Sequence, residues 1–537
     1  MKATGSGFLA GLFIISALAL SCQNPLEKVI TTKIEGVMDT RLKSISVKLA
    51  ADESYSSASL QPAFSPEVTS YTVNGDALIS KADVSALLED SGASLEYRIG
   101  GGAWTSLSSG ASSGIIAVSS GTSVVELKVA SENGRATRTY SVNINVAVSG
   151  AGSPAIFLPS TPSNNAQYGY HVAMSSDGTV LALSSRAYGM VAVYEKSGSS
   201  WVLAANLKDP GTGASDFYGS GLAMSRDGRV IAVGAESQAN GSNTRAGKAY
   251  VFRKIGTSWS TNSEDSIVVP SAPHSDECFG SSVAIADDGK TLVVGADHSA
   301  NGGGAAYVFR GDGAGAWSQE AALSPSIRGQ SDEFGYAVAI SPGGNEIVVG
   351  APGKSMLFFF AYKTGWVEGA NDTIASSRLG CSLTMAPDSG ALCVASGAES
   401  YTIASGNSPG AVFIYRWNYA DATPTVVPGP SFTASNAVNG SCFGWSVSLS
   451  NDNKYLAVAA PSFSSSGNIV GAAYLFRNDS GTWTESTGYA NPHPASSGVW
   501  GIFGSGVALS GDGSAIAIGA QNRTVGSSTS AGVAYVY

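Results

Sequence analysis

Charge is scarce in this chain of 537 residues, and the scarcity excludes some classes of partner. Asp, Glu, Lys and Arg make up 13% of the sequence, about half of the ~25% typical of globular domains. The 40 acidic and 30 basic residues leave a net charge of −10, and there is no block of basic residues to neutralise phosphates. The sequence therefore predicts no nucleic-acid partner.

Histidine is nearly absent, which limits the metal and acid–base chemistry that the chain offers. None of its four residues stands in H-E-x-x-H or another zinc-binding spacing. We interpret them as scattered core or surface residues, and we predict no cofactor. The four are His171, His274, His298 and His493.

Long hydrophobic runs are missing as well, apart from one near the N-terminus. Residues 8–20, FLAGLFIISALAL, follow the basic Lys2 and form an apolar run of about 13 residues, short of the ~20 needed to span a bilayer. Position and length predict a signal peptide over residues 1–21. The apolar run Met356–Tyr362 predicts a strand instead.

The predicted signal ends at a cysteine. Residues 19–22, ALSC, resemble the lipobox of bacterial lipoproteins, with Ala19 where Leu or Val is usual. The resemblance implies that Cys22 carries lipid, that residues 22–40 are a tether, and that the exported protein is anchored in the bacterial envelope, at the outer membrane or cell surface. The alternative is ordinary cleavage after Ala19, which would leave an unmodified N-terminus.

Glycine, in contrast, is plentiful, with 66 residues or about 12% against a usual ~7%, and much of it lies in a repeated phrase. One copy reads FGSSVAIADDGKTLVVGA, and copies start 45 to 64 residues apart. A second phrase of the type GAAYVFRG follows each copy, and in most copies a tryptophan comes next. The seven copies begin at Tyr168, Tyr218, Phe279, Phe334, Leu379, Phe443 and Phe503.

Each copy predicts four short strands. VAIA and TLVVGA are apolar runs on either side of a D-G turn signal, AYVFR is a third strand, and the tryptophan leads into a fourth. The runs are nearly continuous rather than alternating, which is typical of strands covered on both faces. Seven four-stranded sheets packed between their neighbours predict an all-β, seven-bladed β-propeller over residues 154–537.

We expect an N-terminal strand to close this ring. The seventh copy reaches Tyr537 with its third strand, so its fourth strand must come from elsewhere. Residues 156–160, IFLPS, resemble the fourth strand at 267–271, IVVPS, and in both segments the proline stands nine residues before the next repeat. Pairing of this segment with the last blade would remove two open sheet edges.

The phrases FG, DG and Gly350-Ala351-Pro352 resemble the FG-GAP repeat of integrin α-subunit propellers and of many bacterial surface proteins. In that family some turns carry D-x-D-x-D-G calcium loops. The turns in this chain hold at most two adjacent acids, too few for the about six to eight oxygen ligands that calcium takes. Calcium binding in these turns is possible but disfavoured.

The region before the repeats follows another pattern. Apolar and polar residues alternate from Ile45 to Leu49, which predicts strands with one buried face. The phrase L-x-P-x-F-x-P-x4-Y-x-V from Leu60, and a later V-x-L-x-V-A-x2-N-G ending, resemble the cadherin-like β-sandwich domain of bacterial surface proteins. We assign this small sandwich to residues 41–148, followed by a linker at 149–153.

The cysteines beyond the signal are expected to be mostly buried free thiols. Cys381 and Cys393 fall on neighbouring strands of one hairpin in mismatched register. Cys278 and Cys442 occupy equivalent places in separate repeats. Neither pair is therefore expected to form a disulfide, although an exported chain permits one.

Two sets of loop residues mark a candidate ligand face. Acids that precede the first strand of a repeat are either a carboxylate ring for a cation or basic partner, or caps of loop N–H groups. We favour capping, since four of the seven copies lack such an acid. The long loops after the second strand vary most and, by connectivity, emerge on the same face. The candidates are Asp216, Arg245, Asp276, Asp332, Tyr401 and Arg523.

The sequence contains no catalytic motif in the local structure that its chemistry requires. Two G-x-S-x-G matches, at 110–114 and 406–410, lack the following helix that a nucleophilic serine needs. The sequence thus favours a lipid-anchored scaffold that binds a protein or glycan through its loop face. The alternative is a glycan-active hydrolase or lyase, for which two carboxylates about 5–9.5 Å apart in an aromatic-lined central pocket would be evidence.

Overall fold

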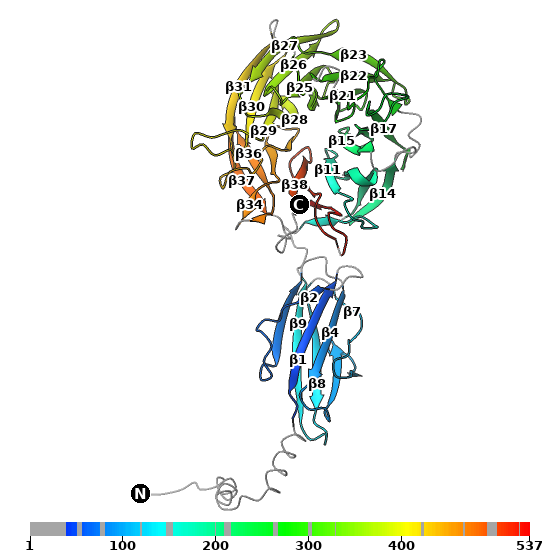
Figure 1. Cartoon of the computed structure of the whole chain (residues 1–537), viewed down its shortest axis with the longest axis vertical. Coiled ribbons are helices and arrows are strands. Elements are labelled where there is room, and N and C mark those ends of the chain that lie inside the picture. Colours follow the sequence, from blue (N-terminus) through cyan, green and yellow to red (C-terminus); the bar gives the residue numbers. More distant parts are fainter. Residues whose placement is uncertain are drawn as a thin grey trace, which may run out of the picture. The chain divides into compact units, whose positions relative to one another are not determined.

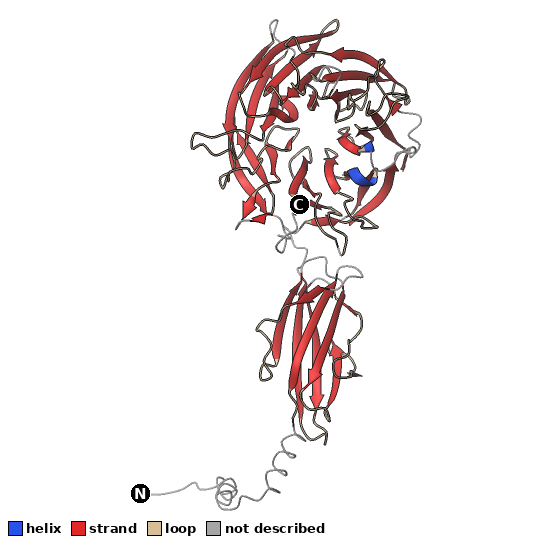
Figure 2. Ribbon diagram, viewed as in Figure 1, coloured by secondary structure: helices blue, strands red, loops and turns tan. Residues whose placement is uncertain are grey.

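The computed structural model describes residues 39–50, 56–75, 81–118, 121–146, 154–198, 200–208, 216–260, 267–298, 303–327, 329–419, 424–465, 468–490, 502–525 and 527–537. The predicted signal, Cys22, the linker at 149–153 and His493 lie outside these residues. The chain divides into two compact units, Met1–Ser153 and Pro154–Tyr537, built almost entirely of strands (Figure 2). Across the described ranges the one helix is the 3-10 turn η1 (Arg186–Tyr188), and no helix is long and apolar enough to cross a membrane.

The first unit is a sandwich of two sheets around one core. The sheet orders are β2-β1-β4-β7 and β3-β9-β8-β5-β6, with β3 and β9 parallel and the other pairs antiparallel. Ile45, Val47 and Leu49 of β1 are buried together with Val84 and Leu127, so the predicted alternation is confirmed. The strands are β1 (Leu42–Ala50), β2 (Ser56–Ala58), β3 (Ser70–Gly75), β4 (Lys81–Leu88), β5 (Ser94–Ile99), β6 (Thr105–Ser106), β7 (Ile116–Ala117), β8 (Gly121–Ala130) and β9 (Thr137–Val146).

The second unit is a β-propeller, and its described residues form seven sheets of four or more strands around a centre (Figure 1). Blade 1 has β11 (Tyr168–Met174), β12 (Val180–Ser185), β13 (Met190–Ser197) and β14 (Ser200–Lys208). Blade 2 has β15 (Tyr218–Met224), β16 (Val230–Ala235), β17 (Lys248–Ile255) and an outer edge shared by β18 (Ser258–Trp259) and β19 (Ile267–Val268). Blade 3 has β20 (Ser282–Ile285), β21 (Thr291–Ala296), β22 (Ala305–Gly311) and β23 (Trp317–Leu323).

The remaining blades repeat this plan. Blade 4 has β24 (Ala337–Ile340), β25 (Glu346–Ala351), β26 (Met356–Tyr362) and β27 (Trp366–Thr373), and blade 5 has β28 (Leu379–Asp388), β29 (Ala391–Ala398), β30 (Ala411–Asn418) and β31 (Thr425–Phe432). Blade 6 has β32 (Val447–Leu449), β33 (Tyr455–Ala460), β36 (Ala472–Asp479) and β37 (Thr482–Ala490), with β34 (Ser464–Ser465) and β35 (Asn468–Ile469) as a small hairpin. Blade 7 has β38 (Phe503–Leu509), β39 (Ile516–Ala520), β40 (Val533–Val536) and, as its outer strand, β10 (Ala155–Phe157).

The ring closes as the sequence predicts. β10 pairs antiparallel with β40, so that Ile156 lies opposite Tyr535 and Phe157 opposite Ala534. The innermost strands also contact one another in ring order, from β11 through β15, β20, β24, β28 and β32 to β38, which returns to β11. The second strands β12, β16 and β21 are buried along their whole length, because sheets cover both of their faces.

Close contact between two glycines explains why glycine recurs in the FG and GA parts of the repeat. Gly280, after the phenylalanine of blade 3, has φ +96°, a left-handed conformation that favours glycine. Its carbonyl oxygen lies against Gly234 at the end of the second strand of blade 2, where any Cβ would overlap it. Six other glycines stand in the position of Gly280, all with φ from +78° to +95°: Gly169, Gly219, Gly335, Gly380, Gly444 and Gly504.

Hydrogen bonds join successive blades at the same seams. The backbone N–H of Phe279 in blade 3 donates to the carbonyl of Ala246 in blade 2 at 3.0 Å. The hydroxyl of Ser282 donates to the carbonyl of Gly335 in the next blade at 2.7 Å. At the closing seam, the hydroxyl of Ser505 in blade 7, one position earlier in its repeat, donates to the carbonyl of Gly169 in blade 1 at 2.8 Å. The motif is therefore a device for close blade-to-blade packing.

The cysteine prediction is confirmed for the residues that the structure describes. Cys278, Cys381, Cys393 and Cys442 are all free thiols, and the first three are buried. In the β28–β29 hairpin Cys393 lies opposite Ala386, five positions along the strand from Cys381. Burial raises the pKa of the Cys381 thiol to about 12, so this group stays protonated.

Candidate binding site at the mouth of the central channel

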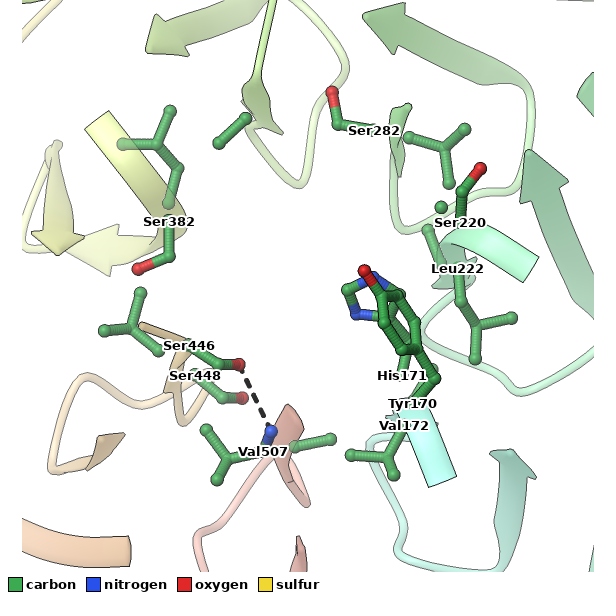
Figure 3. Close-up of a pocket in the computed structure, with 18 of the residues that line it drawn as sticks. Tyr170, His171, Val172, Ser220, Leu222, Ser282, Ser382, Ser446, Ser448 and Val507 are labelled. Atoms are coloured by element: carbon green, nitrogen blue, oxygen red, sulfur yellow. Dashed lines mark hydrogen bonds between the residues drawn. The ribbon is translucent and has the colours of Figure 1, made fainter. Parts of the chain in front are cut away.

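The centre of the propeller holds a cavity of about 590 Å³ lined by the innermost strands of all seven blades. Figure 3 shows the ring of side chains that surrounds it, with the serines Ser220, Ser282, Ser382, Ser446 and Ser448 on its wall. Most of these hydroxyls already bond neighbouring blades; Ser446, for example, accepts the N–H of Val507 at 3.2 Å. The wall of the channel is thus polar, but most of its hydroxyl groups already make hydrogen bonds within the protein.

At one end of the cavity, aromatic and charged side chains join the serines of the wall. Two positions of each repeat supply this end: the residue after the FG-type glycine and the residue directly after the second strand. We call the cavity-lining residues at these positions the channel mouth. They are Tyr170, Ser220, Ser281, Tyr336, Cys381, Trp445 and Ser505 from the first position, and Arg186, Glu236, Asp297 and Gln521 from the second.

Arg186 anchors one side of the channel mouth. Its Nη2 donates to Oε1 of Glu236 at 2.5 Å, across the seam between blades 1 and 2. The guanidinium carbon lies 4.0 Å from the ring centroid of Phe217 and 5.1 Å from that of Tyr170. Ion pairing and two cation–π contacts together hold the charge in a fixed position.

Arg378, beside the channel mouth, anchors the opposite cluster. Its Nε donates to Oε1 of Glu399 at 2.8 Å, and its Nη2 lies 3.1 Å from Oε2 of Glu333. The same guanidinium packs 5.5 Å from the ring centroid of Tyr336. Burial raises the pKa of Glu399 above its ordinary value, although Arg378 acts in the opposite direction.

His171 projects into the cavity next to Tyr170, and the two rings meet edge to face at 4.7 Å (Figure 3). Burial, helped by the positive charge of Arg186, lowers the pKa of His171 to about 4. The imidazole is therefore neutral near pH 7. It is one of the histidines that the sequence left as scattered core or surface residues, and it faces the channel instead.

The six candidate ligand residues do not line this cavity. Arg245 lies 3.6 Å from Asp276, and Tyr401 packs edge to face on Phe413 at 5.2 Å. The backbone carbonyl of Asp216 accepts the N–H of Ser237 at 3.2 Å.

The other two candidates also make local contacts. The Oδ2 atom of Asp332 accepts the backbone N–H of Gly329 at 2.5 Å and lies 3.3 Å from Nζ of Lys354. Arg523 donates to the hydroxyl of Tyr535 at 3.5 Å. The bond from Gly329 is the loop cap that the capping interpretation expects.

The sequence analysis did not predict the channel mouth, because it chose candidate residues among the acids before each repeat and in the long loops. The usable signal lies beside the repeated glycines: one variable residue after FG and one after the second strand, in every copy. Only ring closure brings these positions together. No feature of a single repeat shows that Arg186 meets Glu236, which lies 50 residues away.

The turns compared with calcium loops use their acids internally. Oδ1 of Asp177 accepts the hydroxyl of Ser175 at 2.6 Å and the N–H of Thr179 at 3.0 Å. Among the described residues no group of three or more His, Cys, Asp and Glu side chains is placed to hold a metal ion. These acids therefore stabilise the hairpin turns.

Comparison with protein families supports both halves of the predicted organisation. Residues 42–147 match the cadherin-like beta sandwich domain. Residues 201–252, 263–309 and 317–356 match the FG-GAP repeat. No curated protein matches the chain.

Several solved structures are similar in fold at low identity. The Swd1 beta-propeller domain of Myceliophteria thermophila is 12% identical, with a TM-score of 0.47, over 71% of this chain and 99% of that one. Hydrazine synthase of Kuenenia stuttgartiensis is 14% identical, with a TM-score of 0.43, over 67% and 95%. A putative 6-phosphogluconolactonase of Bacteroides fragilis is 15% identical, with a TM-score of 0.41, over 70% and 90%. The family matches and the sheet topology together show a cadherin-like β-sandwich domain at residues 42–147 and a β-propeller that contains FG-GAP repeats within residues 201–356.

Proposed function

We propose that this protein is an exported interaction scaffold of the bacterial envelope, and that it binds a protein or glycan partner through the propeller face that carries the channel mouth. One observation carries the proposal. The seam glycines repeat from blade to blade, whereas the residues beside them vary among the blades and gather at one end of the channel. A rigid repeated frame that presents variable polar positions on one face is typical of a binding surface.

The long loops after the second strands extend the same face. They begin directly at the second position of the channel mouth, as at Glu236 and Gln521. Arg245 on one of these loops has a side chain that is 56% exposed, and its pairing with Asp276 is loose at 3.6 Å. Such an exposed ion pair contributes little to stability, so it is available to a partner.

An array of proteins and glycans probed with the purified full chain tests this proposal. We expect at least one ligand whose binding falls about tenfold in Arg245→Glu, because the loop face loses a donor and gains repulsion. Arg477→Glu is the matched control, since that arginine is 58% exposed and also pairs with an acid, Asp479. An empty array, or equal losses in both variants, would contradict the proposal.

Anchoring through Cys22 is part of the same proposal and rests on the lipobox resemblance. Mass spectrometry of the protein from bacterial membranes should find Cys22 lipidated and N-terminal. Cys22→Ala should release the protein from the membrane, whereas Cys442→Ala should not. An unmodified N-terminus at Leu20 would overturn the anchor.

A glycan-active enzyme is the second candidate, and the central cavity is the observation that favours it. Three aromatic residues line the channel mouth, and the half-buried Glu399 beside it has a raised pKa, as a general acid requires. Release of reducing ends from a panel of polysaccharides is the assay. Turnover that is lost in Glu399→Gln but kept in Glu485→Gln, a carboxylate of blade 6 outside the cavity lining, would establish this activity.

A further inference from the structure

We infer that the channel mouth is a saccharide-binding site, in which sugar hydroxyls pair with polar atoms that the protein itself leaves without hydrogen bonds. The inference rests on the proposed function and deepens it, because it assigns one ligand class to one part of the binding face. It is carried by four side chains from three blades and by the aromatic rings between them.

Four polar atoms at the channel mouth are buried without a hydrogen-bond partner: Oδ1 of Asp297, Oε1 of Gln521, Nε of Arg186 and Oγ of Ser281. Asp297 is only 6% exposed, and its Oδ1 has one ion-pair contact, with Nδ1 of His298 at 3.2 Å. Buried polar atoms in folded proteins are almost always paired, so four exceptions around one cavity indicate a place where a ligand completes the bonding.

The mixture of atoms selects the chemistry of that ligand. Asp297 and Gln521 offer acceptors, the Nε–H of Arg186 is a donor, and the hydroxyl of Ser281 is either. A cation would satisfy only the acceptors, and an anion only the donors. A hydroxyl group both donates and accepts, so a compound with several hydroxyls on one ring can satisfy all four atoms.

Charge at the channel mouth also argues against an anionic ligand. Arg186 is neutralised by Glu236 at 2.5 Å, and Arg378 beside the channel mouth lies between two glutamates. A phosphate or carboxylate would have to compete with these ion pairs for each guanidinium. A sugar hydroxyl can instead use the Nε–H of Arg186, which makes no hydrogen bond within the protein.

The aromatic residues supply the apolar part of such a site. Tyr170 and Tyr336 are half-buried, and Trp445 is 37% exposed although it lines the cavity. Figure 3 shows the ring of Tyr170 projecting into the opening. Aromatic rings bury the C–H faces of a pyranose while the hydroxyls remain free to bond. The cavity, about 590 Å³, lies within the ~300–1,000 Å³ of small-molecule sites.

Calorimetric titration of the purified full chain tests this inference. The probes are glucose, galactose, mannose, rhamnose and N-acetylglucosamine with their short oligomers, and choline and inorganic phosphate are the charged comparators. Ser281→Ala removes a hydroxyl that makes no hydrogen bond within the protein, and Gln521→Ala removes an amide whose Oε1 makes none, so both variants should fold normally. Thr524→Val is the matched control, because its hydroxyl is also buried without a partner but does not line the cavity.

We expect at least one saccharide to bind, with a Kd that rises about tenfold in Ser281→Ala and in Gln521→Ala and is unchanged in Thr524→Val. Preferential binding of choline or phosphate would overturn the inference, as would the absence of saccharide binding. Saccharide binding that ignores both variants would also overturn it, but would leave the proposed function standing on another part of the face. If no saccharide binds in the titration and the array is also empty, both the saccharide site and the proposed function are contradicted.

Discussion

At the scale of single residues, the seams between blades depend on the absence of side chains. Gly295 is the last residue but one of the second strand of blade 3, and a Cβ there would overlap the carbonyl of Gly335 and the hydroxyl of Ser282. Backbone cannot move away at low cost in a closed ring, because every blade is held from both sides. The same position is occupied by Ser184 in blade 1 and Ala459 in blade 6, whose Cβ atoms face the seam glycines Gly219 and Gly504 of the next blades.

Gly295→Ala should therefore destabilise the propeller by about 1–3 kcal/mol, the usual cost of overpacking. Chemical denaturation followed by circular dichroism measures the change. Gly343→Ala is the control, because Gly343 has ordinary φ and no atom within 4 Å of its Cβ position. Equal stability of the two variants would contradict this account of the seams.

His171 makes stability depend on pH. In the unfolded chain a histidine gains its proton below about pH 6.5, whereas the folded pKa is about 4. Between these values the unfolded state binds more protons, so the contribution of neutral His171 is complete above pH 6.5 and is lost as pH falls toward 4.

Wild type should thus lose up to about 3 kcal/mol more than His171→Gln between pH 7 and pH 4, since each pKa unit corresponds to ~1.4 kcal/mol. Free energies of unfolding at both pH values provide the measurement. His274→Gln replaces an exposed histidine outside the cavity and serves as the control. If wild type and His171→Gln show the same pH dependence of stability, the pKa of His171 is not lowered by folding.

At the scale of elements, the strand β10 closes the ring across the widest separation in sequence. It contributes Phe157, which is 4% exposed and packs edge to face on Tyr194 at 4.8 Å and on Trp201 at 5.6 Å. These rings belong to blade 1, whereas β10 pairs with β40 of blade 7. One three-residue strand therefore joins the first blade to the last.

Phe157→Ala should cost about 3–5 kcal/mol, as for a buried phenylalanine, and should expose the edge of β40 to other chains. Chemical denaturation measures the first effect, and size-exclusion chromatography measures the self-association. Leu203→Ala, on the outer strand of blade 1 and 41% exposed before substitution, should change stability by less than about 1 kcal/mol. If both variants behave alike, β10 is not the closing strand.

At the scale of the whole molecule, two cores are built from separate stretches of chain. The sandwich core contains Leu127 and Tyr140, both fully buried, and draws only on residues of the first unit. The propeller cores draw only on the second. Units with independent cores are expected to unfold as separate cooperative transitions.

Calorimetry should resolve two transitions that respond to different substitutions. Leu127→Ala should lower only one of them, by an amount that corresponds to about 2–5 kcal/mol, and Gly295→Ala should lower only the other. A single transition, or a shift of both by either variant, would show that the two units unfold together.

Most of the fold could be predicted from the sequence because it is encoded locally and repeatedly. Each repeat carries its own turn residues and apolar strands, so a hairpin such as β20–β21 follows from some fifteen consecutive letters. Closure by β10 was also predictable, since the segment keeps the spacing of other fourth strands. In blade 2, however, the outer edge is divided between β18 and β19, which no repeat phrase indicates.

The candidate site was decided by tertiary structure alone. Asp216, Asp276 and Asp332 stood out in the sequence, yet they do not line the cavity, whereas Asp297 and Gln521 do. The sequence by itself determined the repeated strands, the turns and the closing segment, because these depend on neighbours in the chain. Which side chains meet at the centre depends on how seven blades turn about one axis, and that geometry exists only after the ring has closed.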